Sequence, residues 1–409
     1  MSEWKKVKLK DCCHSISDGD HLPPPKSNSG VPFVTIANID ATNHIDFGNT
    51  MFVPLEYYNN LNDIRKAKCN DILYSVVGSF GKPVLIKENI PFAFQRHIAI
   101  LRPNNEIADS RFLYYVMLTR DFFMQADTVA IGAAQRTISL TALRNMEVKL
   151  PSMETQHRIA SILSRYDSLI ENYQKQIKLL EEAAQRLYKE WFVDLRFPGH
   201  ENTNIIDGVP DGWEKKTIDD VTCKVTTGLN PRKNFVLGKG SNYYVTIKNM
   251  ADNTLFLDDR CDRVDNEALE KINKRSDLKI GDILFSGIGT IGRVALVYIP
   301  TNNWNVSESV FTLRANDIVT KEFLYLMLLS PDMQNYCQSN AHGAAQKGIR
   351  MADLKAYSFN LPPFGVIQKF TNLVTPTIKK VSSIRNQIRL LTEARDRLLP
   401  KLMSGEIAV

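Results

Sequence analysis

The chain has 409 residues, a net charge of +6 and a pI near 8.8, with 44% hydrophobic and 23% charged residues. This length allows two or three domains with cores of their own, and the composition is that of an ordinary soluble protein. The mildly basic balance permits nucleic-acid binding but does not establish it.

Several classes of protein are disfavoured by what the sequence lacks. The six cysteines include no CxxC pair and no metal-ligand spacing, which predicts reduced thiols in a cytoplasmic protein without a metal site. The N-terminus has no apolar signal core, and no run of about 18 apolar residues occurs. Neither export nor a membrane span is therefore expected.

In chain order, the first predicted elements are short strands, and each of them returns in the second half. WKKVKL at 4–9 corresponds to WEKKTI at 213–218, which follows a turn-forming PDG. FVTIANI at 33–39 corresponds to YVTIKNM at 244–250, and both are rich in β-branched and aromatic residues, which favours strands. A repeat of this length indicates duplication of a whole domain rather than a solenoid.

The sharpest match is a glycine-rich turn. DILYSVVGSFGK at 71–82 aligns without a gap with DILFSGIGTIGR at 282–293, at an offset of 282 − 71 = 211. Glycines let backbone amides approach a phosphate, and the cation that ends each turn adds charge. The alternative is a glycine-rich hairpin with an exposed cation. The candidate phosphate ligands are Ser79, Lys82, Thr290 and Arg293.

A second matched turn follows a strand and a short amphipathic helix that also repeat. GAAQR at 132–136 corresponds to GAAQK at 343–347. Glutamine can read adenine in the major groove, and Arg or Lys can read guanine or bind phosphate. The alternative is a turn in which the glutamine caps backbone groups. The candidate DNA ligands here are Gln135, Arg136, Gln346 and Lys347.

The two halves diverge between these matches. PPPKSN at 23–28 has a loose counterpart in NPRKN at 230–234, and QR at 95–96 faces SE at 307–308. Different loops on a common frame suit two domains that recognise different DNA sequences, although random divergence of the two copies gives the same pattern. The candidate DNA ligands in these segments are Lys26, Arg96, Arg232 and Lys233.

A long helix follows each globule. Residues 154–190 contain no Gly and no Pro, and at ~1.5 Å per residue their helix would be roughly 55 Å long. The helix carries two apolar rows with heptad spacing: Ile159, Tyr166, Tyr173, Leu180 and Leu187, then Leu163, Ile170, Ile177, Ala184 and Trp191. The stripe returns from Phe370 to Leu402, so the helices are expected to pack on each other as a spacer. The alternative is two unrelated core helices.

Together these elements predict an α+β fold. Two duplicated, mixed α/β domains would be separated by two long helices that form an antiparallel coiled coil, with a pseudo-two-fold axis. Such symmetry suits a two-fold-like partner, of which duplex DNA is the obvious one. The predicted boundaries are 1–150 for the first domain, 151–197 for the first spacer helix, 198–361 for the second domain, and 362–409 for the second spacer helix and tail.

Two sequences that suggest a methyltransferase fail on inspection. FSGIG at 285–289 fits a loop that holds S-adenosylmethionine, but its counterpart at 74–78 lacks a glycine. NLPPF at 360–364 nearly fits an amino-methyltransferase loop, but it carries an extra leucine at a helix entry. No P-loop is present. A stand-alone DNA methyltransferase and a non-DNA protein adaptor are kept as alternatives.

Over nearly its whole length the chain resembles the specificity (S) subunits of type I restriction-modification systems. The resemblance rests on the two-repeat plan, both pairs of turns, both helix entries, and the phrases LYKEWFVDLRFPG at 187–199 and LLPKLMSGEI at 398–407. One departure is Asn70, which stands where the second half has Gly281 before DIL.

The resemblance implies that each globule is a target recognition domain for one half of a bipartite, asymmetric double-stranded DNA site. The coiled coil would set the gap between the half-sites. The subunit would have no catalytic residues and no cofactor. It would dock two methyltransferase (modification) subunits, which bind S-adenosylmethionine and methylate DNA bases, and restriction/translocase subunits, which carry ATP and Mg.

Most affinity is expected to come from phosphate contacts, and specificity from few base contacts in each domain. Three aromatic residues, Trp191, Phe192 and Phe197, lie where the helices are expected to stop covering each other. They are interpreted as a docking surface for the modification subunits, or alternatively as packing onto the adjacent globule.

Overall fold

The computed structural model describes residues 4–21, 23–40, 42–133, 135–251, 253–343 and 347–409. The chain divides into two compact units: unit 1 comprises residues 1–172 and 388–409, and unit 2 comprises residues 173–387. Each unit holds one globular domain and one segment of each long helix, α5 (Met153–Phe192) and α10 (Phe364–Ser404). The units are described in turn.

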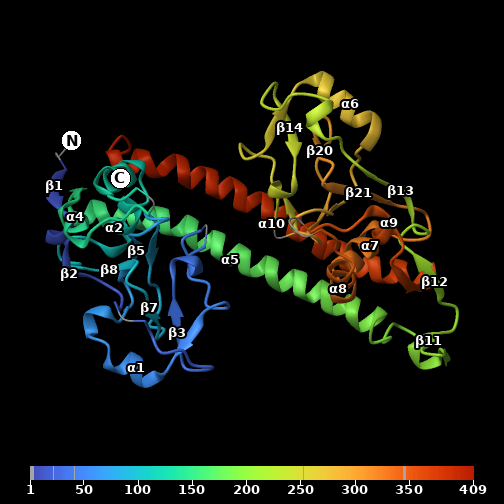
Figure 1. Cartoon of the computed structure of the whole chain (residues 1–409), viewed down its shortest axis with the longest axis horizontal. Helices are drawn as coiled ribbons and strands as arrows, with labels where there is room; N and C mark the ends of the chain where they lie inside the picture. Colours follow the sequence, from blue (N-terminus) through green and yellow to red (C-terminus); the bar gives the residue numbers. More distant parts are fainter. Residues whose placement is uncertain (1–3, 22, 41, 134, 252, 344–346) are drawn as a thin grey trace. The chain divides into compact units, whose positions relative to one another are not determined.

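Unit 1 is built around a four-stranded antiparallel sheet in the order β2-β8-β5-β6 (Figure 1). Alternate residues of β5 enter different cores: Ile72 and Tyr74 face one core, and Leu73 faces the other. Both faces of the sheet are therefore covered, which explains why its central strands are continuous apolar runs. The strands are β2 (Cys13–Asp18), β8 (Ile98–Pro103), β5 (Ile72–Ser75) and β6 (Pro83–Leu85).

Helices cover one face of this sheet and a second sheet covers the other. Phe112, Phe122 and Leu163, from two short helices and from α5, share the first core. The short helices on this face are α2 (Ser110–Met117), α3 (Arg120–Val129) and α4 (Leu140–Asn145), whereas α1 (Leu55–Asn60) packs against the second sheet. The second sheet has the order β4 (Met51–Val53), β3 (Val31–Val34), β7 (Ala93–Phe94). The remaining elements are β1 (Lys5–Lys8), β9 (Glu147–Leu150) and the 3-10 turns Leu9–Cys12, Ile36–Asn38 and Asp63–Arg65.

Unit 2 repeats this plan. Its four-stranded sheet has the order β13 (Thr222–Thr227), β21 (Val310–Ala315), β18 (Ile283–Ser286), β19 (Val294–Leu296). A second sheet has the order β17 (Asp262–Val264), β14 (Asn242–Val245), β20 (Trp304–Val306). The helices are α6 (Asn266–Ser276), α7 (Lys321–Leu328), α8 (Pro331–Ser339) and α9 (Met351–Lys355). The other described strands form two-stranded pairs: β10 (Ile205–Ile206) with β11 (Val209–Pro210), β12 (Glu214–Thr217) with β22 (Ser358–Leu361), and β15 (Met250–Ala251) with β16 (Thr254–Leu255). The described 3-10 turns are His200–Asn202, Pro231–Lys233 and Ile247–Asn249.

The two long helices run antiparallel within each unit. In unit 1 Leu163 of α5 shares a core with Leu402 of α10, and Asp167 pairs with Arg395 at 2.8 Å. In unit 2 Glu181 pairs with Arg385 at 2.6 Å, and the Trp191 ring lies 5.7 Å from that of Phe370. Within each unit, therefore, residue numbers rise along α5 in the direction in which they fall along α10. The predicted α+β fold with two duplicated domains and two long helices is confirmed, and each helix buries part of its apolar stripe.

The rings interpreted as a docking surface are packed inside unit 2. Trp191 and Phe197 are buried, and Phe192 is half-buried. Phe192 lies 4.8 Å from Phe370, and Phe197 lies 5.3 Å from Trp213. This corrects the docking interpretation, because burying the rings in the unit leaves little of their surface for a partner. Packing onto the adjacent globule accounts for them instead.

A polar anchor joins the globule of unit 1 to its segment of α5. Glu171 accepts a hydrogen bond from His44 at 3.1 Å and also pairs with Lys87. The hydrogen bond from His44 lowers the pKa of Glu171 to about 2. The same bond raises the pKa of His44, although partial burial opposes the shift. The loop that carries His44 is therefore held on the helix by this hydrogen bond.

Neither a membrane-spanning helix nor a metal-binding cluster occurs among the described residues. No helix among them is long and apolar enough to span a lipid bilayer. No cluster of three or more His, Cys, Asp or Glu side chains within the described ranges is arranged to hold a metal ion.

Candidate nucleic-acid interface

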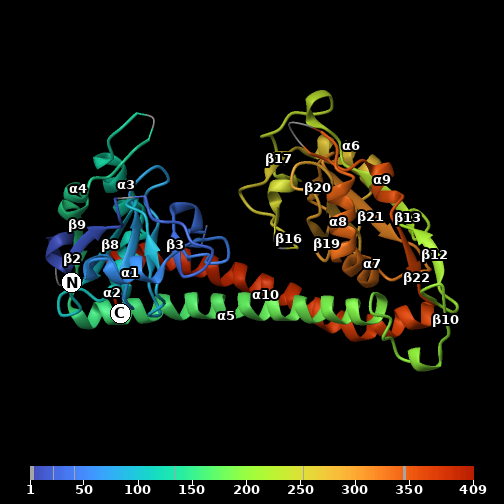
Figure 2. The same ribbon diagram turned by 60° about the horizontal axis from the view of Figure 1, so that its bottom comes forward.

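Four connections gather at one edge of the four-stranded sheet in unit 1. Strands β2 and β5 end at this edge and β8 begins there, because Asp18 pairs with Ala99 and Ser75 pairs with Ile98. The turn after α3 joins the edge through Gly78 N–H, which donates to the Arg136 carbonyl at 2.9 Å. We call these segments, 19–21, 76–82, 95–97 and 131–137 without residue 134, the loop edge of unit 1. Helix α3 and the turn after it lie on the side of unit 1 away from α5 (Figure 2).

Unit 2 has an equivalent loop edge. There the Gly289 N–H donates to the Lys347 carbonyl at 2.7 Å, and the Gly228 N–H donates to the Ser307 carbonyl at 3.2 Å. The loop edge of unit 2 comprises the segments 228–234, 287–293, 307–309, 342–343 and 347–348. In both units, the two turns that the sequence predicted as separate sites thus lie side by side.

A buried serine closes each glycine-rich turn. Ser75 donates its hydroxyl to the Ser79 carbonyl at 3.0 Å and accepts from the Lys82 N–H at 2.9 Å. Ser286 does the same with Thr290 and Arg293, at 2.5 and 2.8 Å. Ser79 and Thr290, the predicted phosphate ligands, are exposed at the apex of these fixed turns. Their DNA contacts stay a prediction.

The cation that ends each glycine-rich turn donates hydrogen bonds to backbone carbonyls outside the turn, and we call this contact the brace. Lys82 donates from Nζ to the Ile39 carbonyl at 3.3 Å. Arg293 donates from Nη1 to the Ile247 carbonyl at 2.9 Å and to the Met250 carbonyl. Part of the hydrogen-bonding capacity of both head groups is therefore used within the fold, on backbone carbonyls of the neighbouring sheet connection, and their predicted phosphate contacts stay a prediction. The offset 250 − 39 = 211 shows that the brace is part of the repeat.

The second pair of turns differs between the units. Arg136 pairs with the Asp127 carboxylate and carbonyl at the end of α3, and its guanidinium lies 5.4 Å from the Phe80 ring. Lys347 is exposed, and no hydrogen bond or ion pair joins its side chain to the described residues. Gln135 is exposed. The candidate Gln346 lies outside the described residues.

Four predicted cations are exposed, and their side chains make no hydrogen bond or ion pair with described residues; three of them lie in the loop edges, and Lys26 lies in the segment before β3. The four are Lys26, Arg96, Arg232 and Lys233. Arg232 and Lys233 occupy the 3-10 turn Pro231–Lys233, which Asn230 caps by accepting from the Arg232 N–H at 2.9 Å. Asn230 in turn donates to Glu308 at 2.7 Å. Sequence analysis missed this positioning role of Glu308, although an Asn before Pro is a recognisable capping signal.

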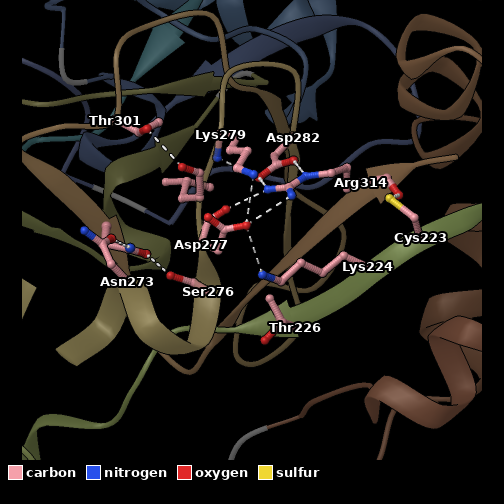
Figure 3. Close-up of polar contacts among 12 residues, drawn as sticks. Cys223, Lys224, Thr226, Asn273, Ser276, Asp277, Lys279, Asp282, Thr301 and Arg314 are labelled. Atoms are coloured by element: carbon pink, nitrogen blue, oxygen red, sulfur yellow. Dashed lines mark hydrogen bonds and ion pairs between the residues drawn. The ribbon is translucent and has the colours of Figure 1, made fainter. Parts of the chain in front are cut away.

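An arginine clamp fastens the opposite end of each four-stranded sheet. In unit 2 Arg314 donates to both carboxylate oxygens of buried Asp282, at 2.7 and 2.9 Å, and to the Asp277 carbonyl at 2.6 Å (Figure 3). These bonds raise the pKa of Arg314, although partial burial opposes the shift. Asp277 also pairs with Lys224 and Lys279.

Unit 1 contains the same clamp. Arg102 donates to the Asp71 carboxylate at 3.0 and 2.9 Å and to the Lys66 carbonyl at 2.9 Å. Asp71, like Asp282, is almost fully buried. The clamps keep the strands in register at one end, so the loop edge at the other end is held on a rigid sheet.

Two copies of one fold, each with fixed turns and exposed cations at one edge, define a duplicated recognition protein. A family model of the type I restriction modification DNA specificity domain matches residues 1–182 and 210–388. The chain belongs to this family. The predicted family, fold class and role in DNA specificity are thereby confirmed.

Individual relatives span most or all of the chain. The type I restriction enzyme MjaIX specificity subunit of Methanocaldococcus jannaschii is 28% identical over 73% of this chain and 69% of its own length. The HindI specificity subunit of Haemophilus influenzae is 24% identical over the whole of both chains. The type I restriction-modification S subunit of M. genitalium has the same fold, with a TM-score of 0.61 and 18% identity over 98% of this chain and 96% of that one.

Proposed function

We propose that the chain reads a bipartite, asymmetric double-stranded DNA site, with one half-site for each unit. The observation that carries this proposal is the pair of loop edges, which share a frame and differ in their exposed side chains. Recognition of two different half-sites requires such a combination, because phosphate contacts position a protein and the variable side chains read bases. Helices α5 and α10 would set the gap between the half-sites.

The proposed DNA ligands, which apart from Lys26 and Gln346 lie in the loop edges, fall into two groups. The exposed cations Lys26, Arg96, Arg232, Lys233 and Lys347 are suited to phosphates, with which their charge interacts at long range. Ser79, Thr290 and Gln135 are exposed on turns that hydrogen bonds hold in place, which suits short-range contacts to base edges or single phosphates. Gln346 is proposed by its match to Gln135.

We also propose that this chain is not itself catalytic and that it acts in the cytoplasm. It would recruit two modification subunits and the restriction/translocase subunits, which would bind S-adenosylmethionine, ATP and Mg. Membership in a family of DNA specificity domains supports this division of labour, as do relatives named as specificity subunits of type I restriction enzymes. The chain's own part would be to choose the DNA site.

Replacing both Arg232 and Lys233 by alanine tests the proposed interface of unit 2. Each phosphate contact contributes about 0.9 to the slope of log affinity against log salt concentration. The double variant is therefore expected to bind target DNA more weakly, with a salt slope about 2 units shallower. Fluorescence anisotropy with labelled duplex DNA over a salt series measures both quantities.

A matched control is available in the same unit. Lys274 and Arg275 are an adjacent, exposed Lys–Arg pair in the last turn of α6, outside the segments of the loop edge and just before Asp277, whose carbonyl accepts from Arg314 of the clamp. Their double alanine variant removes the same charge and is expected to change the slope much less. Equal slopes for the two double variants would contradict the assignment of the interface to the loop edge.

A further inference from the structure

The loop edge of unit 1 carries an aromatic stack in which one ring is exposed and the other is half-buried. The rings of Phe80, in the glycine-rich turn, and Phe123, in α3, lie 5.9 Å apart at 13°. The guanidinium of Arg136 approaches the Phe80 ring to 5.4 Å. Phe123 is 40% exposed, and exposed Met124 and Ile131 extend the apolar surface. Large apolar side chains gathered in this way at a surface commonly mark a binding site.

Unit 2 shows whether the fold itself requires the stacked rings, because the same frame recurs there. The positions matched at an offset of 211 are Ile291 for Phe80 and Gln334 for Phe123. Ile291 is buried, and Gln334 turns inward to donate to the Gly292 and Leu328 carbonyls at 3.0 and 2.8 Å. The same frame thus folds with a buried aliphatic residue and an inward-facing amide. The frame does not need the stack.

The stack is also held in place. The Phe123 ring covers Gly81, where a Cβ would come within 2.7 Å of the ring, so glycine makes the close approach possible. Phe122 packs edge-on against buried Tyr74 at 5.8 Å and anchors this part of α3 in the core. Arg136 is fixed by Asp127. A preformed aromatic surface loses little conformational entropy when it binds a flat partner.

The chemistry of this surface indicates its partner. An unstacked nucleobase has two flat faces, and proteins bind such faces on aromatic rings and on arginine planes. Ser79 and Gln135, exposed hydrogen-bonding side chains of the same loop edge, directly neighbour Phe80 and Arg136 in the chain. Apolar residues at DNA interfaces also enter base steps and unstack them. A protein that bound this patch would not require two stacked rings with hydrogen-bonding side chains beside them, whereas a nucleobase would use both.

We propose that Phe80 and Phe123 form a nucleobase-stacking subsite in unit 1, which takes the face of a base unstacked within the first half-site. This inference rests on the proposed function, because it places the subsite inside the DNA interface. The matched, described positions of unit 2 hold Ile291 and Gln334 in place of the two rings, so this stacking is expected in the first half-site and not at the matched place in the second. The two units thus differ in how they read DNA as well as in what they read.

The test uses the full chain and duplex DNA that carries its target, with 2-aminopurine placed at successive positions. The fluorescence of this base changes when it leaves the stack. We expect a change at one position or two adjacent positions of the first half-site and none in the second. A Phe80→Leu/Phe123→Leu variant should lose this signal and bind about 5- to 150-fold more weakly, the range for loss of one stacked base.

The leucine variant keeps the apolar volume, and the scan with the unchanged chain needs no variant, so misfolding cannot hide the result. Leu55→Ala/Ile64→Ala, which removes two exposed apolar side chains elsewhere in unit 1, should keep the signal. Tight binding without any fluorescence change would overturn the subsite and leave the proposed function intact. So would normal DNA binding by the leucine variant with loss of a protein partner, which would make the patch a protein-docking surface. A chain that binds no DNA would overturn both.

Discussion

Replacing Phe370 by alanine is expected to destabilise unit 2 by about 3–5 kcal/mol, the usual cost of removing a buried phenylalanine. Phe370 is fully buried in α10, and the rings of Phe192, Trp191 and Tyr188 lie 4.8, 5.7 and 6.2 Å away. The loss would leave a cavity where the two long helices meet the globule of unit 2. We expect the helix pairing in that unit to weaken together with the core.

Tryptophan fluorescence during urea unfolding measures this effect. Trp191, Trp213 and Trp304 belong to unit 2, and Trp4 belongs to unit 1, so the signal reports mainly on unit 2. The control is Leu373→Ala on the same helix, which removes a side chain that is 56% exposed. A loss below about 1 kcal/mol for Phe370→Ala, or an equal loss for the control, would contradict the proposed packing.

Arg314→Ala should destabilise unit 2 by about 3 kcal/mol, because it leaves Asp282 buried without its partner. We expect the low end of the range for a broken buried pair, since the arginine itself is partly exposed. Removing Asp282 as well should restore part of the stability, because the uncompensated buried charge accounts for much of the cost.

The Arg314→Ala prediction has two controls, one in the matching clamp of unit 1 and one in unit 2 itself. Arg102→Ala breaks the equivalent clamp in unit 1, so it should leave the main fluorescence transition of unit 2 nearly unchanged. Lys279→Ala removes an exposed partner of Asp277 and should cost less than about 1 kcal/mol. If Arg314→Ala and Lys279→Ala have equal effects, the clamp is not the element that fastens the sheet.

Local sequence patterns were sufficient to predict the frame of each unit. The central strands are short apolar runs next to glycine-rich turns, and the helices have heptad rows, so their type follows from periodicity. The duplication added a check that a single pattern lacks, because each element had to appear twice in the same order. The antiparallel pairing of α5 with α10 within each unit was predicted from the two-fold relation that is expected of two equal copies.

The roles of individual side chains at the loop edge were harder to predict. Lys82 and Arg293 follow glycines in a turn, a pattern shared by phosphate ligands and by braces. Their role as braces depends on the carbonyls of Ile39 and Met250, which lie about 43 residues away in the chain. The Phe80–Phe123 stack likewise joins two distant segments, so no local pattern reveals it. Trp191 was misread because the surface that covers it comes from α10 and the unit 2 globule.

Methylation mapping tests the central claim most directly. The chain would be expressed with a modification subunit of a type I system, each protein would also be expressed alone, and modified bases would be located by long-read sequencing. The account predicts one split, asymmetric motif, modified when both proteins are present. Exchanging residues 228–234 for the matched loop of a relative should alter one half of that motif and leave the other half and the gap unchanged. Modification by this chain alone, or a motif without two separable halves, would contradict the account.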